Sequence, residues 1–258
     1  MSTIAQASPG GVALQVRDLQ KRYGAEKVLQ GVSFAVSPGE ILVLMGPSGS
    51  GKTVLLRHLI GLEEPDAGEI RINGQVVRGA QVLEHYRVAM VFQSAALLNS
   101  LTVAENVGLY LIEHRLRSAE EIRRIVSDKL SLVGLAGAED KFPAQLSGGM
   151  RKRVAIARAL VMEPQLILYD EPTSELDPLS AEVIAEEILA LRDRIGVTSI
   201  VVTHDRTLAF RLGDRIGFLS AGRLVAVDVP QRLRQHPDPM LQQFLQALRG
   251  PVPQEVES

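Results

Sequence analysis

A glycine-rich segment between an apolar run and a helical pattern limits the folds open to this chain more than any other feature. The residues GPSGSGKT occupy positions 46–53, directly after the apolar run ILVLM and at the start of a helical pattern over residues 52–62. A strand that is apolar at every position is expected to be buried on both faces. Glycines let backbone N–H groups curl around a phosphate, which the following lysine and threonine complete with a positive charge and a Mg²⁺ ligand. The segment therefore predicts a nucleotide-phosphate site between a buried strand and a helix.

The alternative interpretation is a glycine-rich turn that happens to precede a lysine and a threonine. Because glycine makes up roughly 7% of protein residues, the bare pattern arises by chance in about one chain of this length in a hundred. The strand before it and the helix after it are the context that a phosphate-binding loop requires. We therefore assign nucleotide binding to the loop and the next residue: Gly46, Pro47, Ser48, Gly49, Ser50, Gly51, Lys52, Thr53 and Val54.

The rest of the chain predicts an α/β fold with two kinds of sheet. Between residues 12 and 78, short β-type segments are separated by the turn signals SPGE and ING, which favour antiparallel pairing. The strands VAMVF, QLILYD and TSIVVTH then alternate with helical patterns at 151–162 and 179–195, as in a parallel sheet with crossover helices. The segment DRIGFLSAGRLVAVD predicts a closing hairpin. Residues 95–150 lack strand signals and predict an inserted helical subdomain.

These patterns suggest a division of the chain. Residues 1–11 are expected to be a flexible lead without the basic start and apolar stretch of a secretion signal. Residues 12–236 are expected to form one domain, with a core of 12–92 and 154–236 and a helical subdomain of 93–153. Residues 237–258 are expected to be a tail, in which the amphipathic residues 240–248 pack across a dimer or on a partner.

Composition excludes several classes of function. A net charge of −2 leaves no broad positive field, so nucleic acid is not an expected partner. The absence of cysteine excludes disulfides and thiolate metal sites and suits a reducing compartment. No apolar run reaches the roughly 18 to 20 residues that span a bilayer. We therefore expect a folded cytoplasmic protein that does not cross a membrane by itself.

Polar side chains follow several of the predicted strands. LILYDE ends in two carboxylates, so Asp170 can hold Mg²⁺ while Glu171 orients and deprotonates a water aimed at the γ-phosphate. His204 ends SIVVTH, where a neutral imidazole can contact the γ-phosphate, and Gln93 ends VAMVFQ, where its amide can contact metal and water. Tyr23 offers a flat ring for stacking on a purine. Each residue also has a structural or solvated alternative, and each signal is weak alone.

A second glycine-rich junction, LSGGMRKR at residues 146–153, raises a separate question. Small residues before a helix leave backbone N–H groups uncovered, and the helix dipole favours an anion there. The chain thus has two features suited to phosphate. The basic residues 151–153 are read as a solvated or interface-lining helix face and not as a nucleic-acid patch.

In this order the residues resemble the ATPase subunits of ABC transporters over residues 12–236. The correspondences are Tyr23 with the adenine-stacking aromatic, residues 46–53 with the Walker A loop, Gln93 with the Q-loop, residues 146–150 with the signature, residues 166–170 with the Walker B strand, Glu171 with the catalytic glutamate, residues 174–177 with the D-loop and His204 with the switch histidine. The resemblance implies a P-loop NTPase fold: a RecA-like parallel sheet, an antiparallel β subdomain and an inserted α-helical subdomain.

The resemblance also implies a mechanism. ATP and Mg²⁺ are the expected ligands, with Lys52, Gln93, Glu171 and His204 as catalytic residues and Thr53, Gln93 and Asp170 around the metal. Since each motif occurs once, a head-to-tail homodimer, or a pairing with a paralogue, is expected. In such a dimer Ser147, Gly148 and Gly149 of one copy bind the γ-phosphate of the ATP held by the other. The membrane partner is a permease, and the location is the cytoplasmic face of the bacterial inner membrane.

A finer resemblance concerns the cargo. Met150 in the signature, the run GKTVLLRHLIGL, the stretch FQSAALLNSLTVAENV and the tail HPDPMLQQFLQALRGPVP look like the ATPases of MCE-type bacterial phospholipid transporters. An MCE-domain protein is then an expected partner. The ATPase of a small-solute importer and a soluble ABC protein of DNA repair or translation remain as alternatives.

One residue departs from the pattern of the family. Glu175 lies in the D-loop where a small residue is usual. A carboxylate at the dimer seam could alter packing or repel the phosphates of the opposite site. The alternative is that Glu175 points to solvent or pairs with a nearby cation.

Overall fold

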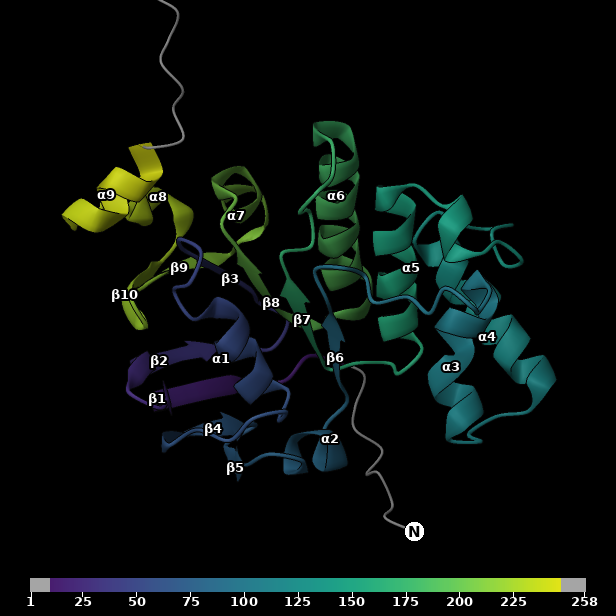
Figure 1. Ribbon diagram of the computed structural model, residues 1–258, viewed down its shortest axis with the longest axis horizontal. Helices are drawn as coiled ribbons and strands as arrows, with labels where there is room; N and C mark the ends of the chain where they lie inside the picture. Colours follow the sequence, from purple (N-terminus) through teal and green to yellow (C-terminus); the bar gives the residue numbers. More distant parts are fainter. Residues whose placement is uncertain (1–9, 247–258) are drawn as a thin grey trace, which may run out of the picture.

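The computed structural model describes residues 10–246 (Figure 1). Residues 1–9 of the predicted lead and residues 247–258 of the predicted tail therefore lie outside the described residues. In the described part, a four-stranded and a six-stranded sheet are joined by helices. No helix within residues 10–246 is long and apolar enough to span a bilayer.

The smaller sheet is antiparallel and has the strand order β2-β1-β4-β5. Its strands are β1 (Leu14–Tyr23), β2 (Glu26–Val36), β4 (Ala67–Ile72) and β5 (Gln75–Val77). Asn73 and Gly74 between β4 and β5 both have positive φ, 49° and 81°, as a two-residue hairpin turn of this twist requires. This is the turn that the ING signal predicts.

The larger sheet has the order β10-β9-β3-β8-β7-β6 and is parallel except for the β9–β10 hairpin. Its strands are β3 (Ile41–Met45), β6 (Val88–Val91), β7 (Leu166–Asp170), β8 (Thr198–Thr203), β9 (Arg215–Ser220) and β10 (Arg223–Asp228). Every residue of β3, β7 and β8 is buried, as the apolar runs ILVLM, LILY and IVV within them predict.

Successive residues of β3 contribute to two different cores. Leu42 and Leu44 pack with helix α1 (Lys52–Leu59) and the antiparallel sheet. Ile41 and Val43 face the opposite core, which includes α5 (Gly148–Leu160), α6 (Pro178–Ile195) and α7 (Arg206–Leu212). Figure 1 shows α1 between the two sheets, with α5, α6 and α7 beyond the larger sheet. The phosphate-binding loop is therefore fixed between two packed layers.

The helical part of the chain contains α3 (Val103–Glu113), α4 (Ala119–Leu132) and a 3₁₀ turn at Pro143–Gln145, which lead into α5. Both α3 and α4 begin with a capping box, formed by Thr102 with Glu105 and by Ser118 with Glu121. The subdomain boundary predicted at residue 153 falls inside α5, which runs without interruption to Leu160.

Several helices differ from the sequence-based prediction. The short helices α2 (Gln81–His85), α7 and α8 (Pro230–Leu233) were not predicted, because four to seven residues give little periodic signal. Helix α1 ends at Leu59 and not near residue 62. Helix α5 begins three residues earlier than predicted because the Ser147 hydroxyl accepts the Met150 N–H and caps it.

The C-terminal helix α9 (Pro239–Gln246) packs on its own chain. Leu241 and Leu245 are buried in the core behind the larger sheet, and the Phe244 ring lies 5.2 Å from that of Phe218. The apolar face predicted to meet a dimer mate or partner is thus covered in cis over the part that the structure describes. Residues 247 and 248 of that predicted segment lie outside it.

Candidate nucleotide-binding site

The polar residues predicted at strand ends meet along one edge of the larger sheet. The phosphate-binding loop follows β3, Gln93 comes two residues after β6, Asp170 ends β7 and His204 follows β8. Because β3, β6, β7 and β8 are parallel, all these points lie at carboxyl ends, where open α/β sheets bind ligands.

A cleft of about 460 Å³ opens at this edge. Its lining comes from residues far apart in the sequence: Tyr23, Val28, Ser48, Gly49, Gly51, Lys52, Thr53, Val54, Gln93, Glu171 and His204. All of these except Val28 were predicted as site residues. The fold thus gathers the aromatic, the phosphate-binding loop, the strand-end amide, the carboxylate and the imidazole around one space.

The glycines of the loop have separate structural reasons. Gly49 and Gly51 have φ of 78° and 100°, a region that side chains disfavour, and a Cβ on Gly49 would meet nothing within 4 Å. A Cβ on Gly46 would lie 2.0 Å from the carbonyl oxygen of Leu219. Gly46 is therefore required by packing against the end of β9, while Gly49 leaves room for close approach of a ligand.

Lys52 carries the charge of the loop. Its Nζ donates hydrogen bonds to the carbonyl oxygens of Gly46 (2.8 Å) and Pro47 (3.0 Å) and lies 3.9 Å from Glu171 Oε1. Burial lowers the pKa of Lys52, while the carboxylates of Glu171 and Asp170 oppose this effect. The ammonium is thus held at the loop by carbonyl groups and by two nearby negative charges.

Thr53 and Asp170 form an oxygen pair suited to Mg²⁺. The Thr53 hydroxyl donates to Asp170 Oδ1 at 3.1 Å, and Asp170 is 6% exposed. Burial raises the pKa of Asp170, whereas the Thr53 hydrogen bond and the Lys52 charge lower it. One carboxylate, one hydroxyl and the phosphates of a substrate are a usual ligand set for Mg²⁺, so the residues present fit this ion.

Glu171 is held by groups from the end of β8. Its Oε2 accepts from the Thr203 hydroxyl (3.0 Å) and the His204 N–H (3.2 Å), and His204 Nδ1 lies 3.0 Å away. Glu171 has a φ of 48°, and its own N–H donates to the Val202 carbonyl. The carboxylate and the imidazole are therefore in direct contact. Thr203 was not predicted, since no sequence motif marks a hydroxyl one residue before His204.

Tyr23 lies at the rim of the cleft and is 44% exposed. Its hydroxyl donates to the Glu63 carboxylate, and this hydrogen bond raises the pKa of Tyr23 and lowers that of Glu63. Lys21 Nζ lies 5.6 Å from the ring centroid. Glu63, four residues beyond the end of α1, thus ties the ring to the helix of the phosphate-binding loop, a link that sequence reasoning did not reveal.

The second glycine-rich junction does not line this cleft. Ser147 is exposed and caps α5, and Gly148 and Gly149 follow it at the helix N-terminus. Added Cβ atoms there would lie 3.1 Å from Leu176 and 3.3 Å from Ser180. The two glycines therefore also allow α5 to pack closely against the D-loop and α6, which was not foreseen.

The basic run after these glycines, predicted to be a solvated or interface-lining helix face, has one buried member. Arg151 is exposed and Arg153 partly so, but Lys152 is 5% exposed. A helical signal could have revealed this, because Lys152 shares a face with Gly149 and Ile156, which are both buried. Glu175 is exposed, in agreement with the solvent-facing alternative, and has a φ of 65°.

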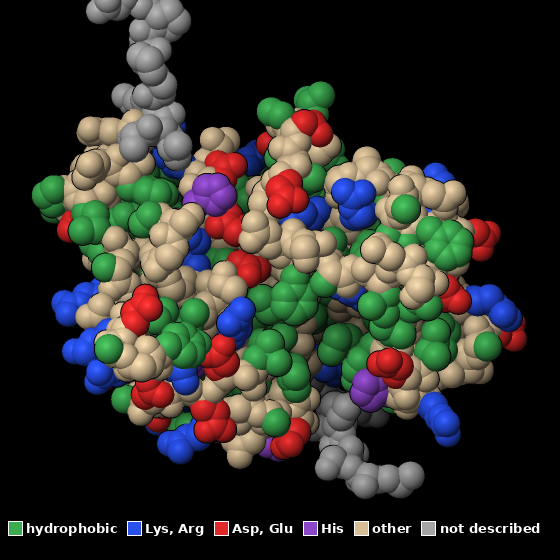
Figure 2. Space-filling view, in the orientation of Figure 1, with side chains coloured by type: hydrophobic (Ala, Val, Ile, Leu, Met, Phe, Trp, Pro, Cys, Tyr) green, Lys and Arg blue, Asp and Glu red, His purple; other side chains and the backbone are tan. Residues whose placement is uncertain are grey.

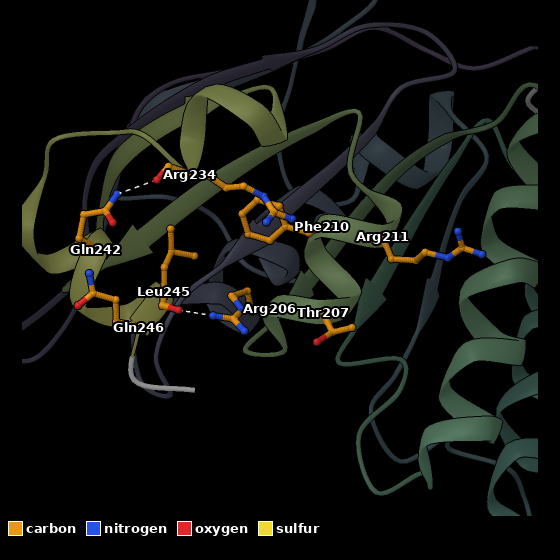
Figure 3. A pocket seen from close by; sticks show the side chains of 8 residues that line it. All are labelled: Arg206, Thr207, Phe210, Arg211, Arg234, Gln242, Leu245 and Gln246. Carbon is orange, nitrogen blue, oxygen red and sulfur yellow. Dashed lines mark hydrogen bonds between the residues drawn. The ribbon is translucent and has the colours of Figure 1, made fainter. Parts of the chain in front are cut away.

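A larger cavity, about 510 Å³, lies elsewhere (Figure 3). It is formed by α7, the end of α8 and α9, and Arg206, whose guanidinium donates to the Leu245 carbonyl, lies at one side. The Arg234 guanidinium stacks 4.3 Å from the centroid of the Phe210 ring. None of the predicted site residues lines this cavity, so size alone does not identify the chemical site.

Comparison with known proteins decides the family. The family model described as ABC transporter matches residues 29–174. The chain belongs to the ABC transporter family. It is similar to the dimeric ATP-binding cassette MJ0796 bound to ADP and phosphate, with a TM-score of 0.75, 33% identity, and coverage of 84% of this chain and 98% of that one.

Curated ABC proteins cover most of the chain. The probable ribonucleotide transport ATP-binding protein mkl of Mycobacterium leprae is 40% identical over 95% of this chain and 72% of its own length. The protein TRIGALACTOSYLDIACYLGLYCEROL 3, chloroplastic, of Arabidopsis thaliana is 39% identical over 93% and 76%. A sulfate/thiosulfate import ATP-binding protein of Chromobacterium violaceum is 43% identical over 87% and 60%.

Membership of the ABC family confirms three predictions. The chain has the α/β P-loop NTPase fold, it is an ATPase, and its ligands are ATP and Mg²⁺. As an ABC transporter ATP-binding subunit it works with a dimer mate and membrane permease partners. The roles of single residues and the transported substance are a separate matter.

Proposed function

We propose that this chain is the ATP-hydrolysing subunit of a bacterial phospholipid transporter, working as a homodimer on a membrane permease. The observation that carries the ATPase part is the cleft itself, in which Lys52, Glu171 and His204 from three separate strand ends surround one space. The proposed location is the cytoplasmic face of the inner membrane, reached through the permease. An MCE-domain protein is the proposed further partner.

The proposed roles follow from the contacts. Lys52 turns from the loop carbonyls to the β- and γ-phosphates, and the loop N–H groups bind the β-phosphate. Thr53, Asp170 and Gln93 hold Mg²⁺, which when bound neutralises charge developing on the phosphate oxygens. Glu171 orients the attacking water and accepts its proton, while His204 positions the carboxylate and contacts the γ-phosphate.

The homodimer proposal rests on the position of the signature. Ser147, Gly148 and Gly149 stand outside the cleft of their own chain, although their helix N-terminus suits an anion. A head-to-tail pair places this helix end over the ATP of the partner and forms two such sites at once. The similar cassette MJ0796 is dimeric. Closing on ATP and opening after hydrolysis are the two states that move the permease.

A groove between the sheets and the helical part supports docking of a permease. It measures about 350 Å³ and is lined by apolar residues that include Leu83, Tyr86, Tyr110 and Leu116. Figure 2 shows hydrophobic side chains around the hollow between the sheets and the helices α3 and α4. An apolar groove rimmed by charge, as here by Arg87 and Asp128, is typical of a surface that binds a protein segment.

The choice of phospholipid rests on the relatives, on Met150 and on the three sequence stretches named with it above. The Arabidopsis protein carries the name of a glycolipid, and its alignment reaches further along this chain than that of the sulfate importer, 93% against 87%. The sulfate importers favour the second candidate, a small-solute importer, through their 40% to 43% identity. The mkl name points to ribonucleotides as a further cargo to test.

Purifying the complex from native membranes tests the cargo. The proposal expects a permease, an MCE-domain protein and bound phospholipid to co-purify with the chain. A periplasmic solute-binding protein in place of the MCE-domain protein would assign the chain to the importers. ATP turnover in the same preparation checks that the complex is intact, so loss of the partner is distinguished from loss of activity.

The contact between Tyr23 and Glu63 leads to a prediction about ATP affinity. Tyr23→Ala is expected to raise KM for ATP roughly fivefold to 150-fold, since base stacking on an aromatic ring contributes about 1 to 3 kcal/mol in comparable nucleic-acid sites. Tyr23→Phe keeps the ring and loses only the hydrogen bond to Glu63, so its KM is expected to rise less. KM is measured by phosphate release across a range of ATP concentrations. Equal KM values for Tyr23→Ala and the parent protein would show that Tyr23 does not contribute to ATP binding.

A further inference from the structure

Lys152 is a buried cation with three partners in the catalytic apparatus. Its ammonium donates to the Gln93 carbonyl and lies 3.4 Å from both the Glu171 carbonyl and the Ser174 hydroxyl. The Ser174 hydroxyl in turn donates to the Glu171 carbonyl at 2.9 Å. One side chain on the signature helix thus reaches the Q-loop, the backbone of the catalytic glutamate and the D-loop.

A second contact joins the same helix to residues 95–96, two and three positions after Gln93 in the Q-loop. The Arg158 guanidinium, six residues further along α5, donates to the carbonyl oxygens of Ala96 (2.6 Å) and Ala95 (2.8 Å). Both alanines have positive φ, 47° and 60°, so this turn needs external support to keep its shape. Lys152 and Arg158 therefore hold the Q-loop at two points along one rigid helix.

Glu175 directly follows Ser174, whose hydroxyl lies 3.4 Å from the Lys152 ammonium. Burial lowers the pKa of Lys152, and among the charges that oppose this, Glu175 acts most strongly, ahead of Asp170 and Glu171. Glu175 is exposed and has a φ of 65°, in the D-loop position where ABC proteins usually have a small residue. Burying a cation without opposite charge nearby is costly, and the negative charge of Glu175 reduces this cost from beyond direct ion-pair distance.

We propose that Lys152 is a positioning residue that fixes the Q-loop, Glu171 and the D-loop relative to the signature helix, and that Glu175 is its counter-charge. A movement of α5 is then transmitted to Gln93 and to Glu171 through one ammonium group. This inference rests on the roles proposed above for Gln93 and Glu171.

The geometry separates this role from simple packing. Lys152 bonds to backbone carbonyls and a hydroxyl and touches neither the phosphate-binding loop nor Tyr23 in the described contacts. Its loss should therefore disturb the placement of the reacting groups and leave ATP binding nearly intact. Misplacement of reacting groups by about 1 Å can cost up to roughly 100-fold in rate.

The test compares four variants of the full chain with the parent: Lys152→Met, Lys152→Gln, Glu175→Ala and Lys152→Met/Glu175→Ala. Phosphate release is followed over a range of Mg-ATP concentrations to separate kcat from KM. Lys141→Met, an exposed lysine of the helical part, is the matched control. Glu171→Gln is the benchmark for the site itself, because full turnover in that variant would sink the proposed roles before Lys152 is judged.

Lys152→Met is expected to lower kcat at least about tenfold with KM changed less than about twofold, whereas Lys152→Gln, which keeps two N–H donors, retains most of kcat. The double variant is expected to recover roughly threefold in kcat over Lys152→Met, because Glu175 no longer faces the site without its cation.

A kcat for Lys152→Met within twofold of the parent would overturn the inference. A loss of kcat in Lys152→Gln equal to that in Lys152→Met would also overturn it. The same holds if the loss of kcat in the double variant equals the product of the two single losses. If Lys152→Met does not fold, as judged by its thermal transition, Lys152→Ala takes its place in every comparison, alone and with Glu175→Ala.

Discussion

Lys52→Ala is expected to lower kcat/KM for ATP by roughly 100-fold or more, because preorganised charge at the reacting phosphates is usually the largest single catalytic effect. The ammonium of Lys52 is 7% exposed and sits among loop carbonyls and two carboxylates. No other lysine or arginine side chain lines the cleft in the part of the chain that the structure describes. Its removal therefore leaves the carboxylates of Asp170 and Glu171 facing the phosphates without compensation.

Nucleotide titration and phosphate release measure this loss. Lys141→Ala, at an exposed position, serves as control and should leave both unchanged. Turnover in Lys52→Ala equal to that of the parent would show that residues 46–53 are not the nucleotide loop of this chain.

Glu171→Gln is expected to bind ATP but to lose roughly 100-fold to 10,000-fold in kcat, the range for removal of a general base. The amide has nearly the shape of the carboxylate, so it can still accept from Thr203 and His204, whose contacts measure 3.0 and 3.2 Å. Only the ability to take a proton from water is lost. ATP should therefore remain bound, and the closed dimer should accumulate.

Phosphate release and size-exclusion elution with Mg-ATP are the two measurements for this variant. Glu120→Gln on the exposed side of α4 is the control. A kcat within threefold of the parent would assign the base to another residue. If Glu171→Gln turns over slowly but still elutes as a monomer at saturating Mg-ATP, this result would count against ATP-dependent closure of the dimer.

The fold could be predicted in large part because the central strands carry an unambiguous signal. Strands β3, β7 and β8 are buried along their whole length, and each contains an apolar run that leads into residues of the site. Parallel pairing then places the ends of these strands together, which is why Lys52, Glu171 and His204 could be expected near one another. Boundaries were less certain where a cap decides them, as Ser147 does for α5.

The contacts that sequence reasoning missed are those between residues distant in the chain. Glu63 meets Tyr23 across 40 positions, and Thr203 meets Glu171 across 32. Neither residue belongs to a motif, and each acquires its role only when separate elements pack together. Lys152 shows a second limit: in a run of three basic residues, only the helical face reveals which one is buried.

Glu175 shows how the structure changes the meaning of a departure from the family pattern. From sequence alone, the extra carboxylate suggested either altered packing or repulsion at the dimer seam, or a position that faces solvent or pairs with a cation. Its exposure agrees with the second alternative, and we propose Lys152 as the cation that it balances. The two residues are therefore best varied together, because either one alone leaves an uncompensated charge close to Glu171.

The central claim is that the signature of one chain completes the nucleotide site of another, and cross-linking tests it directly. The chain contains no cysteine, so Ser48→Cys and Ser147→Cys can be introduced separately into two differently tagged copies carrying Glu171→Gln. Both serines are exposed. We predict that a disulfide between these two tagged chains forms with Mg-ATP and is absent without nucleotide. Ser127→Cys, at an exposed serine of α4, replaces Ser147→Cys as the control and is expected to give no such disulfide. No cross-link with Mg-ATP, or the same yield with and without nucleotide, would contradict the claim.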